Sequence, residues 1–231
     1  PSENQASSTV EQSSACIIPW GKSTKKITAY VQNDNLFIQS KDNLKQITSD
    51  GGNGIVYGQT VHRSEFGITG GLFWSPKGYK LAFYRKDEKR VKDYPIFTIT
   101  ERPAKAKSFK YPMAGDSSHT VKIGVTDESG NIVYLQTEGP YDQYLTNIAW
   151  SPDEKSIYLA WVNRDQNKME LRKYSSQTGA FEGLLFSEEH EKYVEPEHPV
   201  VFLPNDNERF IWQSERDGFN HLYLYNQGTL S

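Results

Sequence analysis

Glu65 is the residue of this chain whose surroundings most suggest chemistry. It lies in VHRSEFGITGGLFWSPKG, residues 61–78, where four glycines and the aromatic pair Phe73–Trp74 surround a single carboxylate. A carboxylate on an ordinary loop is simply solvated, but one fixed in a concave wall attracts a cation strongly, because partial desolvation strengthens the interaction. The glycines would let such a loop bend inward. The residues before it that could support this role are His62, Arg63 and Ser64.

The other reactive side chains form no recognised catalytic motif. The sequence has no Gly-x-Ser-x-Gly nucleophile elbow, phosphate-binding loop, His-Glu-x-x-His or dinucleotide fingerprint. Ser117, Ser118 and His119 are adjacent, but a catalytic triad is a spatial arrangement, and nothing around them indicates one. His62 is better explained as a hydrogen-bonding structural residue than as a base. We therefore predict no catalytic residue in this chain.

The acidic stretch EEHEKYVEPEH, residues 188–198, is the candidate for a metal site. It contains two histidines and five glutamates. Their spacing matches no common ligand pattern, and a solvated acidic loop explains the stretch better. The single cysteine, Cys16, excludes an internal disulfide and a cysteine-rich metal site. We predict neither a metal nor a cofactor.

The bulk composition narrows the class of protein. The chain has 231 residues, a net charge of −3 and 13% aromatic residues. A general nucleic-acid binder usually carries a basic face, so the slight acidity argues against that class. No apolar run approaches the ~18–20 residues of a membrane span. The aromatic content suits strands, and no segment predicts a convincing amphipathic helix.

A repeated pattern predicts the fold. Its copies are FWSPKGYKLAFYR from Phe73, AWSPDEKSIYLAW from Ala149, VFLPNDNERFIWQ from Val201 and, more weakly, IPWGKSTKKITAYV from Ile18. Each strong copy joins an apolar pair, a polar turn centred on Pro and an alternating strand, which is typical of a hairpin. A second hairpin is predicted at residues 35–51, 120–137 and 169–186. Two such hairpins make a four-stranded antiparallel unit.

These units predict an all-β fold, a β-propeller fragment of about four blades. Residues 88–119 are expected to hold one strand and a long loop. Residues 1–26 are polar and low in complexity, which predicts a disordered leader or the degenerate start of a blade. The partial propeller then occupies residues 27–231, and its last hairpin stops before a final strand, as expected of a piece of a larger ring. The residues assigned to the blade cores are Trp74, Trp150 and Trp212.

Several motifs in the right order give a resemblance to a known family. VHRSEFGI, GLFWSPKG, LAFYRKDE, YPMAG, YLTNIAWSPDE, VNRDQN and FIWQSERDGFNHLYLY resemble the N-terminal propeller of dipeptidyl peptidase IV-type enzymes of the prolyl oligopeptidase clan. The resemblance is strongest to the bacterial prolyl tripeptidyl peptidases and covers residues 27–230 approximately. It implies an eight-bladed propeller and a C-terminal α/β-hydrolase domain with the catalytic Ser, Asp and His, which is absent from this chain.

The resemblance also implies a role for Glu65. In this family a Glu-containing blade segment pairs with the substrate's α-ammonium, and the enzyme releases short peptides ending in proline from a free N-terminus. Dipeptidyl peptidases carry two adjacent glutamates there, whereas this chain has Ser64–Glu65 in the pattern His-x-x-Glu-Phe-Gly-Ile of the tripeptidyl relatives. Tripeptide release is favoured, and dipeptide release is the alternative. The family's carbonyl-binding arginine has no counterpart in residues 1–26.

The implied partners are a peptide with a free N-terminus and the chain's own hydrolase domain. A homodimer of the full-length form is allowed, and nucleic acid is not expected. The resemblance alone implies a periplasmic, cell-surface or secreted location in a bacterium. Arg164 and Arg216 are expected to form charged pairs within or between blades. The alternative function is a non-catalytic propeller that serves as a protein-interaction scaffold, because a fold does not settle activity.

The absence of a nucleophile motif leads to a testable prediction. The 231-residue chain alone should leave proline-containing chromogenic di- and tripeptides intact and should resist labelling by a fluorophosphonate probe, because it supplies no activated serine. Turnover that survives further purification, or stoichiometric labelling, would contradict it.

Overall fold

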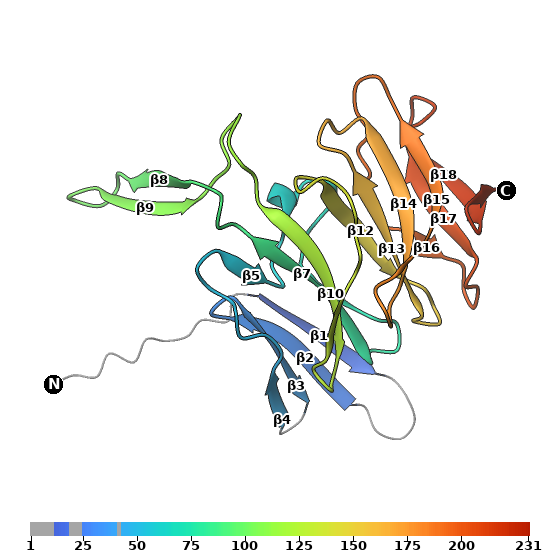
Figure 1. The fold of residues 1–231 in the computed structure, drawn as a ribbon, viewed down its shortest axis with the longest axis horizontal. Helices are drawn as coiled ribbons and strands as arrows, with labels where there is room; N and C mark the ends of the chain where they lie inside the picture. Colours follow the sequence, from blue (N-terminus) through green and yellow to red (C-terminus); the bar gives the residue numbers. More distant parts are fainter. Residues whose placement is uncertain (1–11, 19–24, 41–42) are drawn as a thin grey trace.

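The described strands form five antiparallel sheets, and four of them, blades one to four, stand side by side in chain order (Figure 1). The computed structural model describes residues 12–18, 25–40 and 43–231. Within these ranges there is no α-helix, and the one helical turn is the 3-10 turn η1 (His62–Ser64). The predicted all-β propeller architecture of about four blades is confirmed.

Blade one contains β1 (Gln12–Ile18), β2 (Lys25–Gln32), β3 (Asn35–Ser40) and β4 (Asn43–Gln46), in that spatial order. The backbone of β1 pairs with β2, from Gln12 opposite Val31 to Ile18 opposite Lys25. This strand lies inside the segment 1–26 for which a leader or the degenerate start of a blade is expected. Residues 1–11 and 19–24 of that segment lie outside the described residues.

Blade two contains β5 (Ile55–Tyr57), β6 (Leu72–Trp74), β7 (Lys80–Asp87), β10 (Thr120–Asp127) and β11 (Ile132–Tyr134). Both β5 and β6 pair with the same edge of β7. Between them the chain leaves the sheet at Gly58, whose N–H donates to the Tyr84 carbonyl, and returns at Gly71, whose carbonyl accepts the Tyr84 N–H. The edge strand is thus interrupted by residues 59–70, here called the excursion, which carries Glu65.

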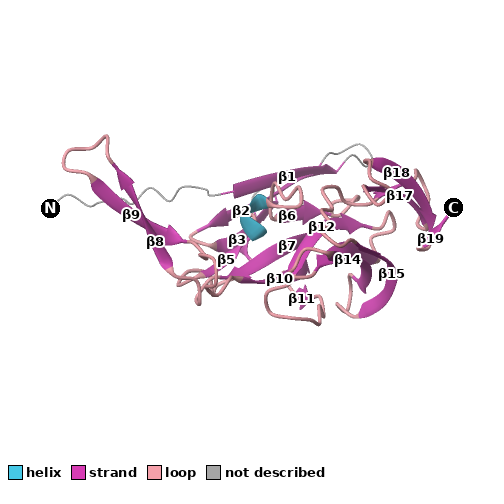
Figure 2. Cartoon of the chain, turned by 90° about the horizontal axis from the view of Figure 1, so that it is seen from above, coloured by secondary structure: helices cyan, strands magenta, loops and turns pink. Residues whose placement is uncertain are grey.

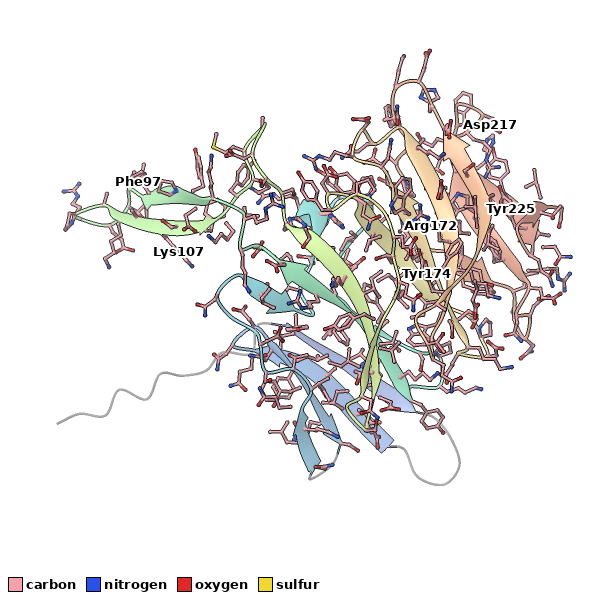
Figure 3. All side chains as sticks on the ribbon, in the orientation of Figure 1. Phe97, Lys107, Arg172, Tyr174, Asp217 and Tyr225 are labelled. Atoms are coloured by element: carbon pink, nitrogen blue, oxygen red, sulfur yellow. The ribbon has the colours of Figure 1, made fainter. Side chains whose placement is uncertain are left out.

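A two-stranded sheet, β8 (Asp93–Thr98) with β9 (Lys105–Lys110), projects away from the blades (Figures 1 and 2). We call it the arm, and Figure 3 shows Phe97 and Lys107 on it. The prediction of a single strand and a long loop in residues 88–119 is therefore wrong. Every residue of β8 is exposed. Because the arm packs neither face against a core, no alternation of buried and exposed residues marked it as a strand pair.

Blades three and four follow the predicted hairpin pattern. Blade three contains β12 (Tyr144–Trp150), β13 (Ser156–Val162), β14 (Lys168–Ser175) and β15 (Phe181–Glu189). Blade four contains β16 (Val201–Phe202), β17 (Arg209–Ser214), β18 (His221–Asn226) and β19 (Thr229–Leu230). The expectation that the last hairpin stops before a final strand is wrong, because β19 pairs with β18; its two residues are too few to show an alternating pattern. The strand pairings confirm the turn-centred hairpins that begin at Phe73, Ala149 and Val201 and the second hairpins of blades one, two and three.

The core consists of apolar layers between consecutive blades. Blades two and three each lie between two neighbours, so an inner strand such as β13 of blade three is buried at every position. Leu36, Ile55 and Phe83 pack between blades one and two, and a second cluster, with Ile123 and Leu145, joins blades two and three. A third cluster joins blades three and four through Tyr158, Phe210 and Trp212. Trp150 and Trp212 are buried and Trp74 packs against the first cluster, which confirms their assignment to blade cores.

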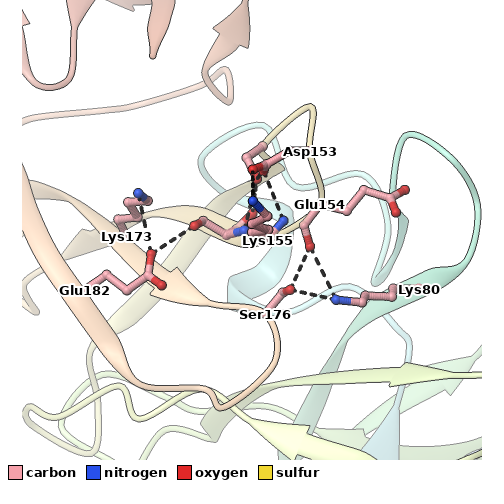
Figure 4. Close-up of polar contacts among 9 residues, drawn as sticks. Lys80, Asp153, Glu154, Lys155, Lys173, Ser176 and Glu182 are labelled. Atoms are coloured by element: carbon pink, nitrogen blue, oxygen red, sulfur yellow. Dashed lines mark hydrogen bonds and ion pairs between the residues drawn. The ribbon is translucent and has the colours of Figure 1, made fainter. Parts of the chain in front are cut away.

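Polar contacts fix blade two against blade three (Figure 4). The Lys80 ammonium donates to the Ser176 hydroxyl at 2.9 Å and to the Glu154 carbonyl at 3.4 Å. The Ser176 hydroxyl also donates to that carbonyl, at 2.7 Å. The buried Glu154 carboxylate accepts the Lys77 N–H at 2.5 Å. These bonds connect the Pro-turns of two neighbouring blades, so they hold the angle between them.

The two arginines differ in their contacts. Arg216 of blade four lies 2.7 Å from Glu188 of blade three, which confirms a charged pair between blades. For Arg164 the prediction is wrong: among the described residues it makes no ion pair, and its guanidinium donates to the Tyr144 hydroxyl at 2.5 Å. Its guanidinium lies 5.5 Å from the centroid of the Tyr144 ring, so its contacts in the described part of the chain are with this tyrosine and not with a carboxylate.

Candidate functional site

The excursion carries an unusual run of left-handed backbone. His62, Arg63, Ser64 and Phe66 have φ between +51° and +63°, whereas Glu65 is extended at φ −66° and ψ 168°. A residue with a side chain resists the left-handed region, at a cost on the order of 1 kcal/mol or more per residue. Such strain persists only where the surrounding structure fixes it, and it concentrates at functional sites. Here the strained residues flank one exposed carboxylate, that of Glu65.

Contacts with blade three hold the excursion behind Glu65. Phe66 is 3% exposed, and its ring packs edge-on against Tyr144 at 5.1 Å. The Phe66 carbonyl accepts the Thr146 hydroxyl at 3.3 Å. Gly67 has φ +68°, and a Cβ there would lie 2.0 Å from the Glu197 carbonyl oxygen. Only glycine fits that position, so the backbone of the excursion lies directly against the Glu197 carbonyl.

Two buried histidines support the excursion from below. The His62 N–H donates to His119 Nε2 at 3.1 Å, and the Leu145 N–H donates to His62 Nε2 at 3.1 Å. Because both Nε2 atoms accept a hydrogen bond, both rings are neutral with the proton on Nδ1. The pair connects the excursion, the residue that precedes β10 and blade three. His62 is thus a hydrogen-bonded structural residue, and His119 is its partner and not part of a Ser117–Ser118–His119 triad.

Burial sets the protonation of this pair. It lowers the pKa of His62 well below the ordinary value, and the nearby His119, Arg164 and Lys86 lower it further. Burial, followed by the positive charges of Lys86, Arg164 and Arg63, lowers the pKa of His119 to about 4. Protonation of either Nε2 would remove the acceptor of a buried backbone N–H, so the neutral rings are required by the fold.

The free energy of unfolding should therefore fall as the pH drops below 6.5. A folded-state pKa below the unfolded value means that the unfolded chain binds more protons, which favours unfolding at lower pH. His119 alone should remove about 2 kcal/mol between pH 7 and pH 5. Urea denaturation at the two pH values measures this loss. His119→Gln, whose amide oxygen can accept the same N–H, should weaken the dependence; an unchanged slope would contradict the prediction.

The Glu65 carboxylate has one protein partner among the described residues. Its Oε2 accepts the Gln166 side-chain N–H at 3.1 Å, and Gln166 lies in the turn between β13 and β14 of the next blade. The Gln166 carbonyl in turn accepts the Val194 N–H at 2.7 Å, so the turn is itself held. A carboxylate offers about four acceptor positions. One bond orients Glu65 and leaves the remaining positions open to a cationic donor.

His62, Arg63 and Ser64, which are predicted to support Glu65, differ in burial and in contacts. His62 is buried, whereas Arg63 and Ser64 are exposed. Arg63 turns to the arm, where its guanidinium lies 4.2 Å from the centroid of Tyr111. Sequence reasoning missed Gln166 as a partner of Glu65. Gln166 lies 101 residues after Glu65. The only sign of its importance was its place in the motif VNRDQN, in which Arg164 was the residue singled out.

The acidic stretch 188–198 begins in β15 and continues as a loop after Glu189. Glu188 belongs to β15 and accepts from Trp212 and Ser214 of blade four, whereas His190 Nδ1 accepts the backbone N–H groups of Lys192 and Tyr193. In the described ranges, no three side chains of His, Cys, Asp and Glu lie close enough together to hold a metal.

In the same ranges, no helix has the length and apolar character needed to cross a membrane.

Comparison with solved structures supports the architecture. A crystal structure from Bacteroides ovatus, described as a dipeptidyl aminopeptidase IV, gives a TM-score of 0.81 at 50% sequence identity, covering 88% of this chain and 28% of that one. The structure of Porphyromonas gingivalis dipeptidyl peptidase 4 gives a TM-score of 0.79 at 25% identity, covering 93% of this chain and 33% of that one.

The curated relatives are also described as dipeptidyl peptidases or aminopeptidases, one of them as inactive. A protein of Uncinocarpus reesii described as a dipeptidyl-aminopeptidase B is 26% identical over 225 residues, which cover 85% of this chain and 24% of that protein. The inactive dipeptidyl peptidase 10 of Rattus norvegicus is 26% identical over 242 residues, covering 94% of this chain and 29% of that protein. The chain thus spans about a quarter of the length of these relatives.

The family itself is identified by its sequence model. The model of the dipeptidyl peptidase IV (DPP IV) N-terminal region matches residues 2–230, which is almost the whole chain. The blades described above are those of its propeller, in agreement with the two solved structures. This chain belongs to the family of dipeptidyl peptidase IV N-terminal regions.

Proposed function

We propose that this chain is the propeller of a serine exopeptidase and that Glu65 anchors the substrate's α-ammonium. The supporting observation is the excursion: four residues in left-handed backbone, a buried histidine pair and a bond from Gln166 hold one exposed carboxylate in a defined place. An ammonium bound there forms a charge-assisted hydrogen bond, and its attraction to the carboxylate strengthens as water is excluded.

The reaction needs a second domain. In this proposal a C-terminal α/β-hydrolase domain supplies the nucleophile, and the propeller limits access to the cavity between them. An acid at a fixed distance from the nucleophile accepts only substrates whose free N-terminus reaches it, so the distance sets the length of the released peptide. The substrates are peptides with proline near the N-terminus. A periplasmic, cell-surface or secreted location in a bacterium and a homodimer of the full-length form belong to the same proposal.

The length of the released peptide is the finer part of the proposal. Ser64 stands where dipeptidyl peptidases have a first glutamate, so we favour release of tripeptides, with dipeptides as the alternative. The relatives named above are described as dipeptidyl enzymes, which keeps that alternative open. The full-length protein should be given Xaa-Pro and Xaa-Xaa-Pro chromogenic substrates with free N-termini. The ratio of the two kcat/KM values decides between them.

The anchoring role is tested by kinetics in the full-length protein. Glu65→Gln should be compared with the wild type on free and N-acetylated versions of one peptide. A loss confined to the free peptide supports the proposal, because only the free peptide carries the ammonium. A loss of the same size on both peptides opposes it.

A scaffold without catalytic activity is the second candidate. The observation that favours it is the relative from Rattus norvegicus, whose name states that it is inactive, at 26% identity over most of this chain. A scaffold predicts that the full-length protein cleaves no proline peptide and that Glu65→Gln changes nothing measurable in a peptidase assay. Turnover by the full-length wild type would reject this candidate.

A further inference from the structure

A cavity of about 330 Å³ opens beside the excursion, between η1, the end of β7 and the return of the arm. We call it the basic pocket, and its charged lining residues are Arg63, Lys86, Lys110 and Glu88. His62 and His119, the neutral buried pair, form part of its wall. Three permanent cations therefore face one carboxylate, on a chain whose net charge is −3.

Among the described residues, Arg63 is the cation of this pocket that has no carboxylate partner. Lys86 lies 3.0 Å from Glu88, and Lys110 lies 3.2 Å from Asp93. Arg63 stacks on the Tyr111 ring, and no described acidic side chain lies within ion-pair distance of it. The N–H donors of a guanidinium lie in its own plane, so contact of its face with a ring leaves its edge able to bind a planar anion through two parallel hydrogen bonds.

The surroundings make the pocket more than a surface patch of positive charge. Lys86 continues the row of Ala82 and Tyr84 along one face of β7, and its side chain is only 15% exposed. Arg63 is held in left-handed backbone at φ +58°, so its position is restricted. Charges in a partly desolvated, restricted place attract an anion more strongly than charges on flexible surface chains.

We propose that the basic pocket binds one carboxylate group, with Arg63 as its bidentate ligand and Lys86 and Lys110 as supporting cations. Two sources have this chemistry: an acidic side chain of a bound peptide and a small free carboxylate. The first rests on the proposed function, because Arg63 lies two residues from Glu65 on the same rigid excursion. The second does not depend on it.

Binding is tested on the 231-residue chain by titration with acetate, against chloride at equal ionic strength. The ring signal of His119 in a ¹H–¹³C NMR spectrum should shift saturably with acetate. Arg63→Gln should weaken the apparent affinity about tenfold or more, because the bidentate contact is lost. Arg90→Gln is the matched control: Arg90 also stacks on a tyrosine, 5.3 Å from the Tyr141 centroid, but lies outside the pocket. Circular dichroism should confirm that both variants fold.

The two sources are separated in the full-length protein. Peptides with glutamate at position one or two should be compared with their glutamine counterparts, and Arg63→Gln should remove any preference for glutamate. A preference lost in this variant assigns the pocket to substrate. An acetate shift without a peptide preference assigns it to a free carboxylate. If acetate moves His119 no more than chloride does, or if Arg63→Gln changes nothing, the pocket does not bind carboxylates.

The outcome is independent of the test of Glu65. If Glu65→Gln leaves the kinetics on free N-termini unchanged while the acetate shift persists, the anchoring role is wrong and the basic pocket stands. If the acetate shift is absent while Glu65→Gln loses activity only on peptides with a free N-terminus, the anchoring role stands and the basic pocket is wrong.

Discussion

Glu65→Gln in the full-length protein should lower kcat/KM for peptides with a free N-terminus by roughly 10²-fold or more. Losing one member of a partly desolvated charge pair costs about 2–5 kcal/mol, and each ~1.4 kcal/mol is a factor of ten. Gln keeps the shape of the side chain, and its amide oxygen can still accept the hydrogen bond from Gln166. The change should barely affect folding, because Glu65 is exposed and the buried contacts of the excursion come from its neighbours.

The controls separate the charge from the fold. N-acetylated peptides should already be poor substrates of the wild type, and Glu65→Gln should make them little worse. Glu197→Gln is the matched variant: its side chain is also exposed, and its backbone carbonyl lies against Gly67 of the same excursion. It should leave kcat/KM unchanged. If both variants lose activity equally, a general electrostatic effect explains the loss and Glu65 is a solvated loop acid.

Trp212→Ala should lower the free energy of unfolding of the 231-residue chain by about 3–5 kcal/mol. Trp212 is 1% exposed and is among the largest fully buried side chains between blades three and four. Removing it leaves a cavity that flanking strands cannot fill. It also removes the 2.9 Å hydrogen bond from the indole to Glu188, whose other partners are Ser214 and Arg216. Urea denaturation followed by far-ultraviolet circular dichroism measures the loss.

Two variants control for this result. Trp212→Phe keeps most of the volume but removes the indole donor, so it should lie between wild type and Trp212→Ala. Phe219→Ala deletes a ring that is 73% exposed and should change the free energy of unfolding by less than about 0.5 kcal/mol. A loss for Phe219→Ala as large as that for Trp212→Ala would show that burial between the blades is not the cause.

The hairpins were predictable from the sequence because their determinants are local. In FWSPKGYKLAFYR the Pro-turn and the strand alternation lie within a few residues of each other, and β6 pairs with β7 there. The arm was not predictable in the same way. Its strands have no buried face, so the pattern of apolar residues that identifies a strand is absent even though the two backbones pair along their whole length.

Glu65 itself stood out from its segment: one acid among glycines and aromatic residues, in a pattern that resembles a known family. That interpretation could be made from neighbouring residues alone. The position of the Glu65 carboxylate, in contrast, depends on residues that are distant in the sequence. Gln166, Tyr144 and His119 come from two other parts of the chain, and no spacing in the sequence indicates that they meet the excursion.

The sequence by itself therefore determined the all-β class, the repeated hairpins and the choice of Glu65 as the acid of the proposed function, because alternation, turn residues and charge are properties of short segments. Only the tertiary structure decided where that acid is held. The edge strand of blade two is interrupted between β5 and β6, so the excursion leaves the sheet there. Packing of blade three against blade two then fixes the excursion through the buried histidines. Such contacts join residues far apart in the chain, and they exist only once the blades have stacked.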